Sequence, residues 1–293
     1  MFIADISKEI QIPVDQMRWV YAVGIVLLIA GVNMFARNFR HVCTQGGRVR
    51  FDLFGFPDVL VAVTLSVMFA LLLVLQWVPA DPPGPAGGGE TTVRGMKGMD
   101  AIYGALQFAL PVAAIFALLI GRDISVLEVF GLRRVGIARA LVLAGWMILL
   151  LLPIFLLVTG FAYKFLGGHA EQQELVKVYQ QATKTGRQDV VWQVAVAAVC
   201  IAPVTEEFLF RGYIYPVFKR IVGPMPAAFG TSILFAAIHN NALGFPGLTV
   251  LALALTLLYE RTGSLVVPIF MHAWFNGVTL FFMWWAVTHD WVK

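Results

Sequence analysis

The sequence predicts an all-α, polytopic membrane protein. Of its 293 residues, 59% are hydrophobic and 13% are charged, whereas a soluble domain carries roughly 25% charged residues. The mean hydropathy is +0.81, and several apolar runs reach the ~20 residues that a helix needs to cross a bilayer core. Because lipid offers the backbone no hydrogen-bond partner, we expect these long runs to be helices.

Eight apolar windows define the expected spans. The first begins at Trp19, after several charged residues, and no small-residue cleavage pattern follows it, so we interpret it as a retained helix. The sixth and seventh windows are short, which suits tilted helices or helices shielded by their neighbours. The windows cover residues 19–36, 58–78, 101–120, 138–160, 190–218, 225–239, 246–259 and 264–287.

Basic residues between the windows orient the helices. The loops 37–56 and 121–139 each carry four arginines against fewer acidic residues, which predicts that both loops are cytoplasmic. Alternation then places both termini outside. The Pro/Gly-rich stretch 80–92 reads as an external connector, and 161–189 as an amphipathic or loop segment. The net charge of +4 belongs to these short clusters, so no nucleic-acid partner is expected.

The chain is expected to form one integral membrane domain with two parts. Residues 1–189 hold about four spans of unassigned role, and 190–293 hold the remaining spans together with ionisable residues at membrane depth. An ionisable group at that depth costs roughly 2.5–3.5 kcal/mol and usually faces a bundle interior or a water-filled cavity. The polar residues concerned are Glu206, Glu207, Arg211, His239, His272 and Asn276.

Helical spacing separates the two glutamates of "EEFLFRG". Glu207 and Arg211 are four residues apart, so they share a helix face at ion-pairing distance. Glu206 lies about 100° around the same helix and is left without that partner. We therefore expect Glu206 to be the carboxylate that exchanges protons.

The same four-residue spacing relates Phe235 to His239 and His272 to Asn276. At a rise of ~1.5 Å per residue, Glu206 and His239 each lie about 20 Å, and His272 about 12 Å, from one membrane side. They are expected to converge on one internal cavity. A water held by Glu206 and His239 would attack a carbonyl there, while His272 and Asn276 stabilise the oxyanion.

Three ordered motifs carry a family resemblance. "EEFLFRG", "FAAIH" and "HAWFN" follow the patterns EExxxR, FxxxH and Hxxx(N/D). In that order they closely resemble the CPBP family, which comprises the type II CAAX prenyl proteases and the bacteriocin-processing or self-immunity membrane proteins. The resemblance covers roughly residues 190–290.

The resemblance implies an eight-helix intramembrane glutamic endopeptidase with a conical active-site cavity and no cofactor. It implies that Glu206 and His239 activate water and that His272 and Asn276 form the oxyanion site. The expected partners are the lipid bilayer and a membrane-associated or lipid-modified substrate, with a prenylated CAAX-type protein among the options, in the cell membrane of a prokaryote. The resemblance leaves supporting roles to Glu207, Arg211 and Phe235.

Other functions use the same residues. One alternative is a non-proteolytic membrane scaffold or bacteriocin self-immunity protein. Another is a zinc-dependent protease in which Glu206, His239 and His272 bind the metal, although the motif HExxH is absent. A proton-coupled transporter also buries acids and histidines, but we find no paired inverted repeats. The physiological substrate and the oligomeric state are left open.

Overall fold

The computed structural model describes residues 14–77, 102–104, 106–166 and 174–289. These ranges contain helices and no strand, which confirms the all-α fold class. The predicted connector 80–92 lies outside them. The first part of the chain forms α2 (Val14–Gln45), α3 (Phe56–Trp77), α6 (Ala109–Ile120), α7 (Val126–Val129), α8 (Ile137–Leu166) and α9 (Glu174–Lys184). The second part forms α10 (Gln188–Val196), η1 (Ala197–Ile201), α11 (Ala202–Glu207), η2 (Phe208–Ile214), α12 (Tyr215–Val222), α13 (Pro224–Ile238), α14 (Phe245–Thr262) and α15 (Val266–Thr288).

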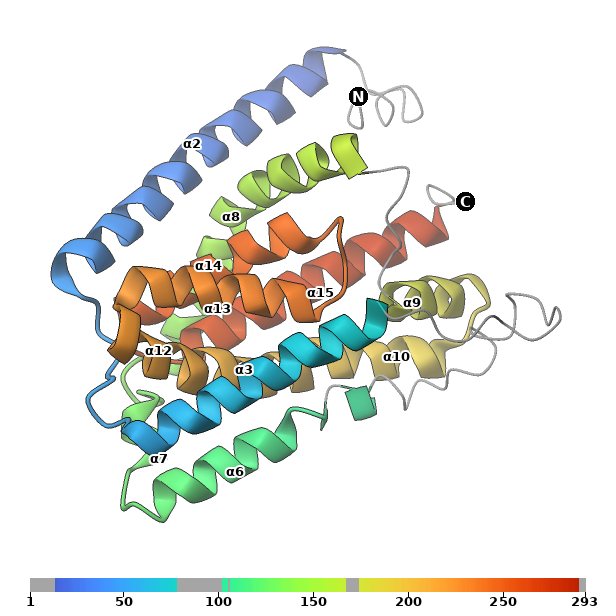
Figure 1. The fold of residues 1–293 in the computed structure, drawn as a ribbon. Helices are drawn as coiled ribbons and strands as arrows, with labels where there is room; N and C mark the ends of the chain where they lie inside the picture. The colour runs from blue at the N-terminus through green and yellow to red at the C-terminus, as the bar shows by residue number, and fades with distance from the viewer. Residues whose placement is uncertain (1–13, 78–101, 105, 167–173, 290–293) are drawn as a thin grey trace, which may run out of the picture.

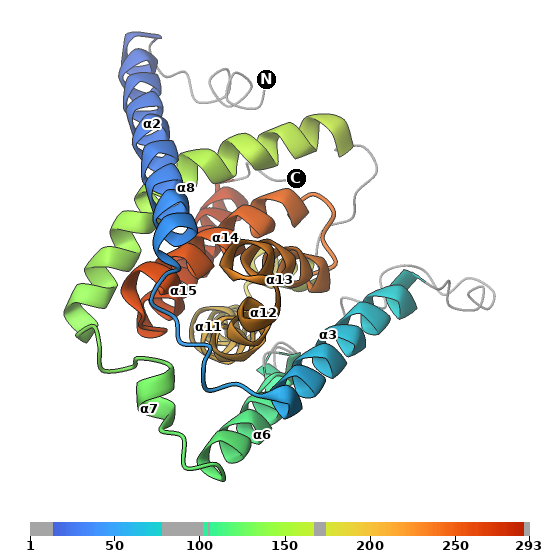
Figure 2. The same cartoon turned by 60° about the vertical axis from the view of Figure 1, so that its left-hand side comes forward.

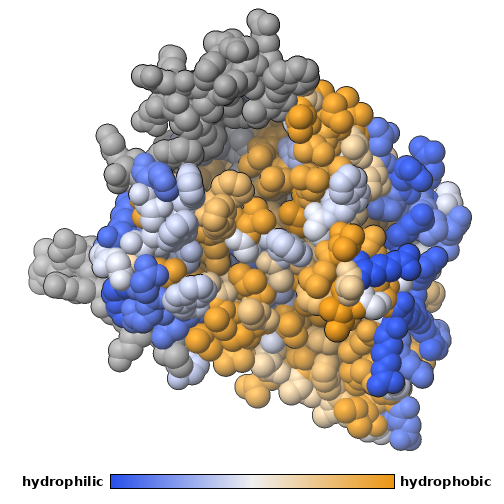
Figure 3. All heavy atoms as spheres, turned by 180° about the vertical axis from the view of Figure 1, so that it is seen from behind, coloured by the Kyte–Doolittle hydropathy of each residue, from blue (hydrophilic) through white to orange (hydrophobic). Residues whose placement is uncertain are grey.

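Within the described residues, five helices are long and apolar enough to cross a membrane, so the chain is a multi-pass membrane protein. Two more predicted spans fall on shorter apolar helices, Phe56–Leu72 and Pro224–Ile238. The total of eight spans therefore stays a prediction. The five long helices are Tyr21–Gln45, Ile102–Ile120, Ile137–Leu166, Gln188–Val222 and Val266–Thr288. In Figure 3 an apolar band separates two hydrophilic rims on the face shown, as expected for a molecule embedded in lipid.

The helices α13 and α14 form a hairpin whose turn stops short of the end of α15 (Figure 1). With 15 residues, α13 is about 22 Å long, less than the ~30 Å of a bilayer core. Asn240 adopts a positive φ of 44°, and Oδ1 of Asn241 accepts the backbone N–H of Gly244 at 2.9 Å.

The helix α14 is the centre of the bundle. Its side chains from Leu251 to Glu260 are buried on every face, as expected for a helix surrounded by protein. It packs against α13, α8, α15 and α2. Figure 2 shows α3 and α6 on the other side of the molecule from α8, where α3 packs on α12 and α13, and α6 on η2.

Residues Gln188–Val222 form one continuous helix, here called the glutamate helix. Two π-helical segments, η1 and η2, interrupt its α-helical winding on either side of the glutamates. Each π segment ends just before an α-helix that has proline in second position, Pro203 or Pro216. Proline has no N–H to donate to the preceding turn, and π segments often lie at functional sites.

A buried ion pair fastens the loop after α2 to the second part of the chain. Glu260 at the end of α14 accepts hydrogen bonds from Lys219 Nζ (2.7 Å), Tyr215 Oη (2.6 Å) and the backbone N–H of Val49 (3.0 Å). The Lys219 and Glu260 side chains are 2% and 0% exposed. Gly47 precedes this contact with a φ of +72°, and a Cβ there would collide with the Glu260 carboxylate.

A second buried carboxylate joins α3 to the glutamate helix. Asp58 is fully buried; its two oxygens accept Nη1 of Arg122 at 2.9 and 2.8 Å. Oδ1 also accepts the hydroxyl of Tyr213 at 3.1 Å, and Oδ2 the backbone N–H of Gly55 at 2.6 Å. The two loops that sequence places on one membrane side therefore both close the same end of the bundle. Which side that end faces stays a prediction.

Candidate active site

The two adjacent glutamates lie inside the bundle. Glu206 is 7% exposed and Glu207 is fully buried. The short helix α11 carries both and packs against α15, which carries His272 and Asn276. A charged group at this depth is costly unless it is paired or used, so the partners of each carboxylate decide its role.

Glu207 is paired twice through one oxygen. Its Oε1 lies 2.8 Å from Nη1 of Arg211, which confirms the predicted ion pair, and 2.9 Å from Nδ1 of His272. Nη2 of Arg211 donates to the carbonyl of Ala252 at 3.2 Å. The guanidinium also lies 4.4 Å from the ring centre of Phe235, a cation–π distance. The link from Glu207 to His272 was not predicted, because helical spacing relates residues within one helix only.

His239 directly follows the last residue of α13 and has a fixed tautomer. Its Nδ1 lies 2.7 Å from the carbonyl oxygen of Phe235. Since a carbonyl can only accept, Nδ1 carries the proton and, in the neutral ring, Nε2 keeps a lone pair. The Phe235 ring contacts both histidines, with ring centres 4.7 Å from His239 and 5.7 Å from His272. Phe235 thus shields the imidazoles on one side.

Both histidines point their other nitrogen at Glu206. Nε2 of His239 and Nε2 of His272 each lie 3.9 Å from Oε2 of Glu206. That oxygen is buried and has no hydrogen-bond partner among the described residues. A separation of 3.9 Å is too long for a direct hydrogen bond and is of the kind that a water can bridge. The sequence placed these three side chains together, and the structure brings them together; the conical cavity stays a prediction.

Asn276 lies one turn beyond His272 and is held by a backbone carbonyl. Its Nδ2 donates to Ala198 O in η1 at 2.7 Å. In η1 the carbonyl of Ala197 accepts the N–H of Ala202, five residues on. The same pattern would pair Ala198 O with Pro203, which has no N–H. The Asn276 amide satisfies this carbonyl instead, and its second N–H is not used by that bond.

Within the part of the chain that the structure describes, no group of three or more His, Cys, Asp or Glu side chains is arranged to hold a metal ion. The three groups that could serve as zinc ligands are Glu206, His239 and His272. Their geometry adds no support to the zinc alternative, which a chelation experiment decides.

Of the comparisons with known proteins, one gives a match, and it falls in the second part of the chain. Neither a curated protein nor a solved structure matches. The family model for "type II CAAX prenyl endopeptidase Rce1-like" matches residues 188–278, a stretch that runs from the start of the glutamate helix past Asn276. Membership in this family implies a membrane-embedded protease. Residues 188–278 are therefore a domain of the Rce1-like type II CAAX prenyl endopeptidase family.

Proposed function

We propose that the chain is an intramembrane endopeptidase that cleaves a membrane-associated or lipid-modified peptide with a water activated by Glu206 and His239. The observation that carries the proposal is the unpartnered Oε2 of Glu206, which faces Nε2 of two histidines at 3.9 Å. The cell membrane of a prokaryote stays the predicted location.

The first step forms the bond between water and the substrate. One hydrogen of the water bonds to the lone pair on His239 Nε2, which the Phe235 carbonyl leaves free. The other proton passes to Oε2 of Glu206 as the water oxygen attacks the carbonyl carbon of the scissile peptide. The π electrons of that carbonyl move to its oxygen, giving a tetrahedral oxyanion.

His272 and Asn276 are the proposed donors to that oxyanion. Nδ1 of His272 donates to Glu207, so Nε2 can donate only when the ring is the imidazolium, and the Glu207 carboxylate stabilises the positive charge. Asn276 offers its second amide N–H while the first stays on Ala198. In the second step Glu206 returns its proton to the amide nitrogen, the C–N bond breaks, and a carboxyl group and an amine are released.

Cleavage by purified protein tests the proposal. The full chain in detergent is incubated with prenylated and unprenylated peptides, and products are identified by mass spectrometry. Glu206→Gln keeps the shape of the side chain but cannot take a proton, and we expect its rate to fall at least about 10²-fold, the lower end for general base catalysis. His239→Gln tests the second water-binding group. Glu128→Gln changes an exposed carboxylate and is the matched control.

The outcomes separate the alternatives. Wild-type rates in both Glu206→Gln and His239→Gln would refute the mechanism. Activity that is lost on strong chelation and restored by zinc would favour the metalloprotease. A folded wild-type protein that cleaves none of the peptides would favour the scaffold or self-immunity role.

A further inference from the structure

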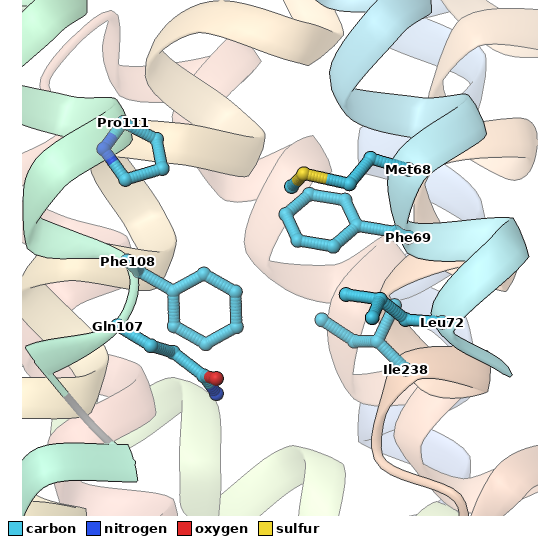
Figure 4. Close-up of a pocket in the computed structure, with 7 residues that line it drawn as sticks. All are labelled: Met68, Phe69, Leu72, Gln107, Phe108, Pro111 and Ile238. Carbon is cyan, nitrogen blue, oxygen red and sulfur yellow. The ribbon is translucent and has the colours of Figure 1, made fainter. Parts of the chain in front are cut away.

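A partly open cavity of about 150 Å³, lined mostly by apolar side chains, lies between α3, α6 and the end of α13 (Figure 4). In the close-up the side chains of Gln107, Phe108 and Pro111, at the start of α6, face those of α3 across it, with Ile238 beside Leu72. Its lining residues are Met68, Phe69 and Leu72 of α3, Gln107, Phe108 and Pro111 at α6, and Ile238 of α13.

This cavity adjoins the candidate active site. Ile238 is bonded directly to His239 in the chain. A row of ring contacts also leads there: Phe69 stacks on Phe210 with ring centres 5.8 Å apart, and Phe210 meets Phe235 at 5.3 Å. Phe235 in turn contacts both histidines. A group in the cavity would therefore lie close to the candidate active site.

The size and chemistry of the cavity limit its occupant. A volume of about 150 Å³ is large enough for a benzene molecule, which is the size of a phenylalanine ring, and six of the seven lining side chains are apolar. The cavity also has an entrance, because Met68 and Leu72 are 40% and 49% exposed. Gln107, exposed at α6, supplies an amide that can bond to a peptide backbone.

We propose that this cavity is a specificity pocket for one apolar side chain of the substrate, of leucine to phenylalanine size, close to the scissile bond. The proposal rests on the proposed endopeptidase function. A peptide side chain fits the whole volume, whereas an isoprenoid or acyl chain is much longer than a benzene ring and would enter only by its tip. Gln107 gives a second argument for a peptide, because a hydrocarbon chain has no group that could bond to the side-chain amide.

A peptide series tests the selectivity. One position of a cleavable peptide is varied through Ala, Leu, Phe and Trp, and the ratios of kcat/KM are compared between variants. For wild type we expect Leu and Phe to exceed Ala by about 10- to 200-fold, the range for apolar pockets. Leu72→Trp fills the cavity and should lower the Leu/Ala ratio about tenfold. Leu71→Trp is the matched control, because Leu71 does not line the cavity and is 55% exposed.

A crosslinking measurement does not depend on turnover. The Glu206→Gln protein is irradiated with a peptide that carries a diazirine analogue of leucine at the varied position, and labelled residues are mapped by mass spectrometry. We expect labels on α3 and α6 that disappear in the Leu72→Trp background and persist with Leu71→Trp. A diazirine-bearing fatty acid, added separately, tests the lipid as occupant.

The two measurements distinguish a failure of the pocket from a failure of the endopeptidase function. Peptide labels in the cavity without cleavage by wild type would sink the endopeptidase function and leave the pocket standing. Cleavage with an unchanged Leu/Ala ratio in Leu72→Trp would overturn the pocket and leave the endopeptidase standing. Labelling of the cavity by the fatty acid but not by the peptide would also overturn it. Each variant is first shown to keep the wild-type unfolding midpoint in detergent.

Discussion

Nδ1 of His272 lies 2.9 Å from Oε1 of Glu207, although 65 positions separate the two residues in the chain. The same oxygen lies 2.8 Å from Arg211. One atom of the glutamate helix therefore neutralises a buried cation and fixes the orientation of a ring on α15. The ring's other nitrogen is thereby directed at Glu206.

The losses of unfolding free energy from removing the two members of the buried pair should not add. Arg211→Met leaves the Glu207 carboxylate without its cation, and breaking a buried pair in this way costs about 3–5 kcal/mol. Glu207→Gln leaves the arginine uncompensated in the same way. The double variant should lose much less than the sum of the two single losses. Unfolding free energies measured in one detergent give the cycle; strict additivity would contradict it.

Asn276→Ala should affect stability and activity by separable routes. The loss of the bond to Ala198 leaves a carbonyl without a donor, at a cost of about 1–3 kcal/mol. In a Pro203→Ala background the new backbone N–H can serve that carbonyl, so the stability loss should shrink. The cleavage rate, reduced about 10²–10³-fold if the amide also serves the oxyanion, should stay low in the double variant.

Thr279→Val is the control for the same helix. Its hydroxyl donates to Phe275 O four residues back within α15. The Thr279→Val variant should keep both its stability and its cleavage rate close to wild type. Recovery of the cleavage rate together with stability in the Asn276/Pro203 double variant would show that Asn276 acts on structure alone.

Two neighbouring glycines separate backbone strain from steric conflict. Gly46 and Gly47 both have positive φ, 76° and 72°, but a Cβ meets nothing within 4 Å at Gly46 and meets the Glu260 carboxylate at Gly47. Gly46→Ala should therefore cost about 1 kcal/mol from strain alone. Gly47→Ala should cost clearly more and speed hydrogen exchange at the amide of Val49. Equal losses in the two variants would rule out the steric conflict.

The burial of Asp58 should make it far more important than the exposed Asp52. Asp58→Asn weakens the contact with Arg122 and leaves buried donors poorly matched, so we expect a loss of at least about 2 kcal/mol in unfolding free energy. In Asp52→Asn the exposed pair with Arg50 is lost, and pairs of this kind contribute about 0–1 kcal/mol. Similar losses in the two variants would contradict this account.

The exposed pair also has a defined pH dependence. The hydrogen bond from Arg50 lowers the pKa of Asp52 below its ordinary value. Its small contribution to stability is therefore present above the ordinary pKa of an aspartate and is lost as pH falls through the lowered value. A titration of the Asp52 carboxyl by NMR should move up on Arg50→Gln and stay unchanged on Arg187→Gln, which disrupts a separate pair with Asp189.

The sequence was a good guide to positions along each helix. The window 190–218 falls on the glutamate helix, and the four-residue spacing of Glu207 and Arg211 does place them in contact. The depth estimate also placed His239 near Glu206, because rise along a helix is regular. The roles of Glu206, His239, His272 and Asn276 in a reaction stay predictions.

The individual hydrogen bonds between helices were beyond the same reasoning. The rotation of α15 about its axis decides that His272 meets Glu207, and sequence spacing does not determine that rotation. Asp58 and Glu260 did leave a signal, since each is an acid at the edge of an apolar window, but nothing local names Lys219 or Arg122 as its partner. Pro203 and Pro216 marked the π segments in retrospect, because each lacks the N–H that regular winding needs.

The family match begins at residue 188, yet the hydrogen bonds of Glu260 begin at Val49. The last third of the chain, produced on its own, would hold a buried carboxylate that has lost its backbone donor, and a Lys219 that has lost the Val49 carbonyl. Val49 is synthesised some 170 positions before Lys219, its partner in this network. The matched domain and the segment after α2 thus share one buried hydrogen-bond network, so residues 188–278 expressed alone should be less stable than the same residues in the full chain.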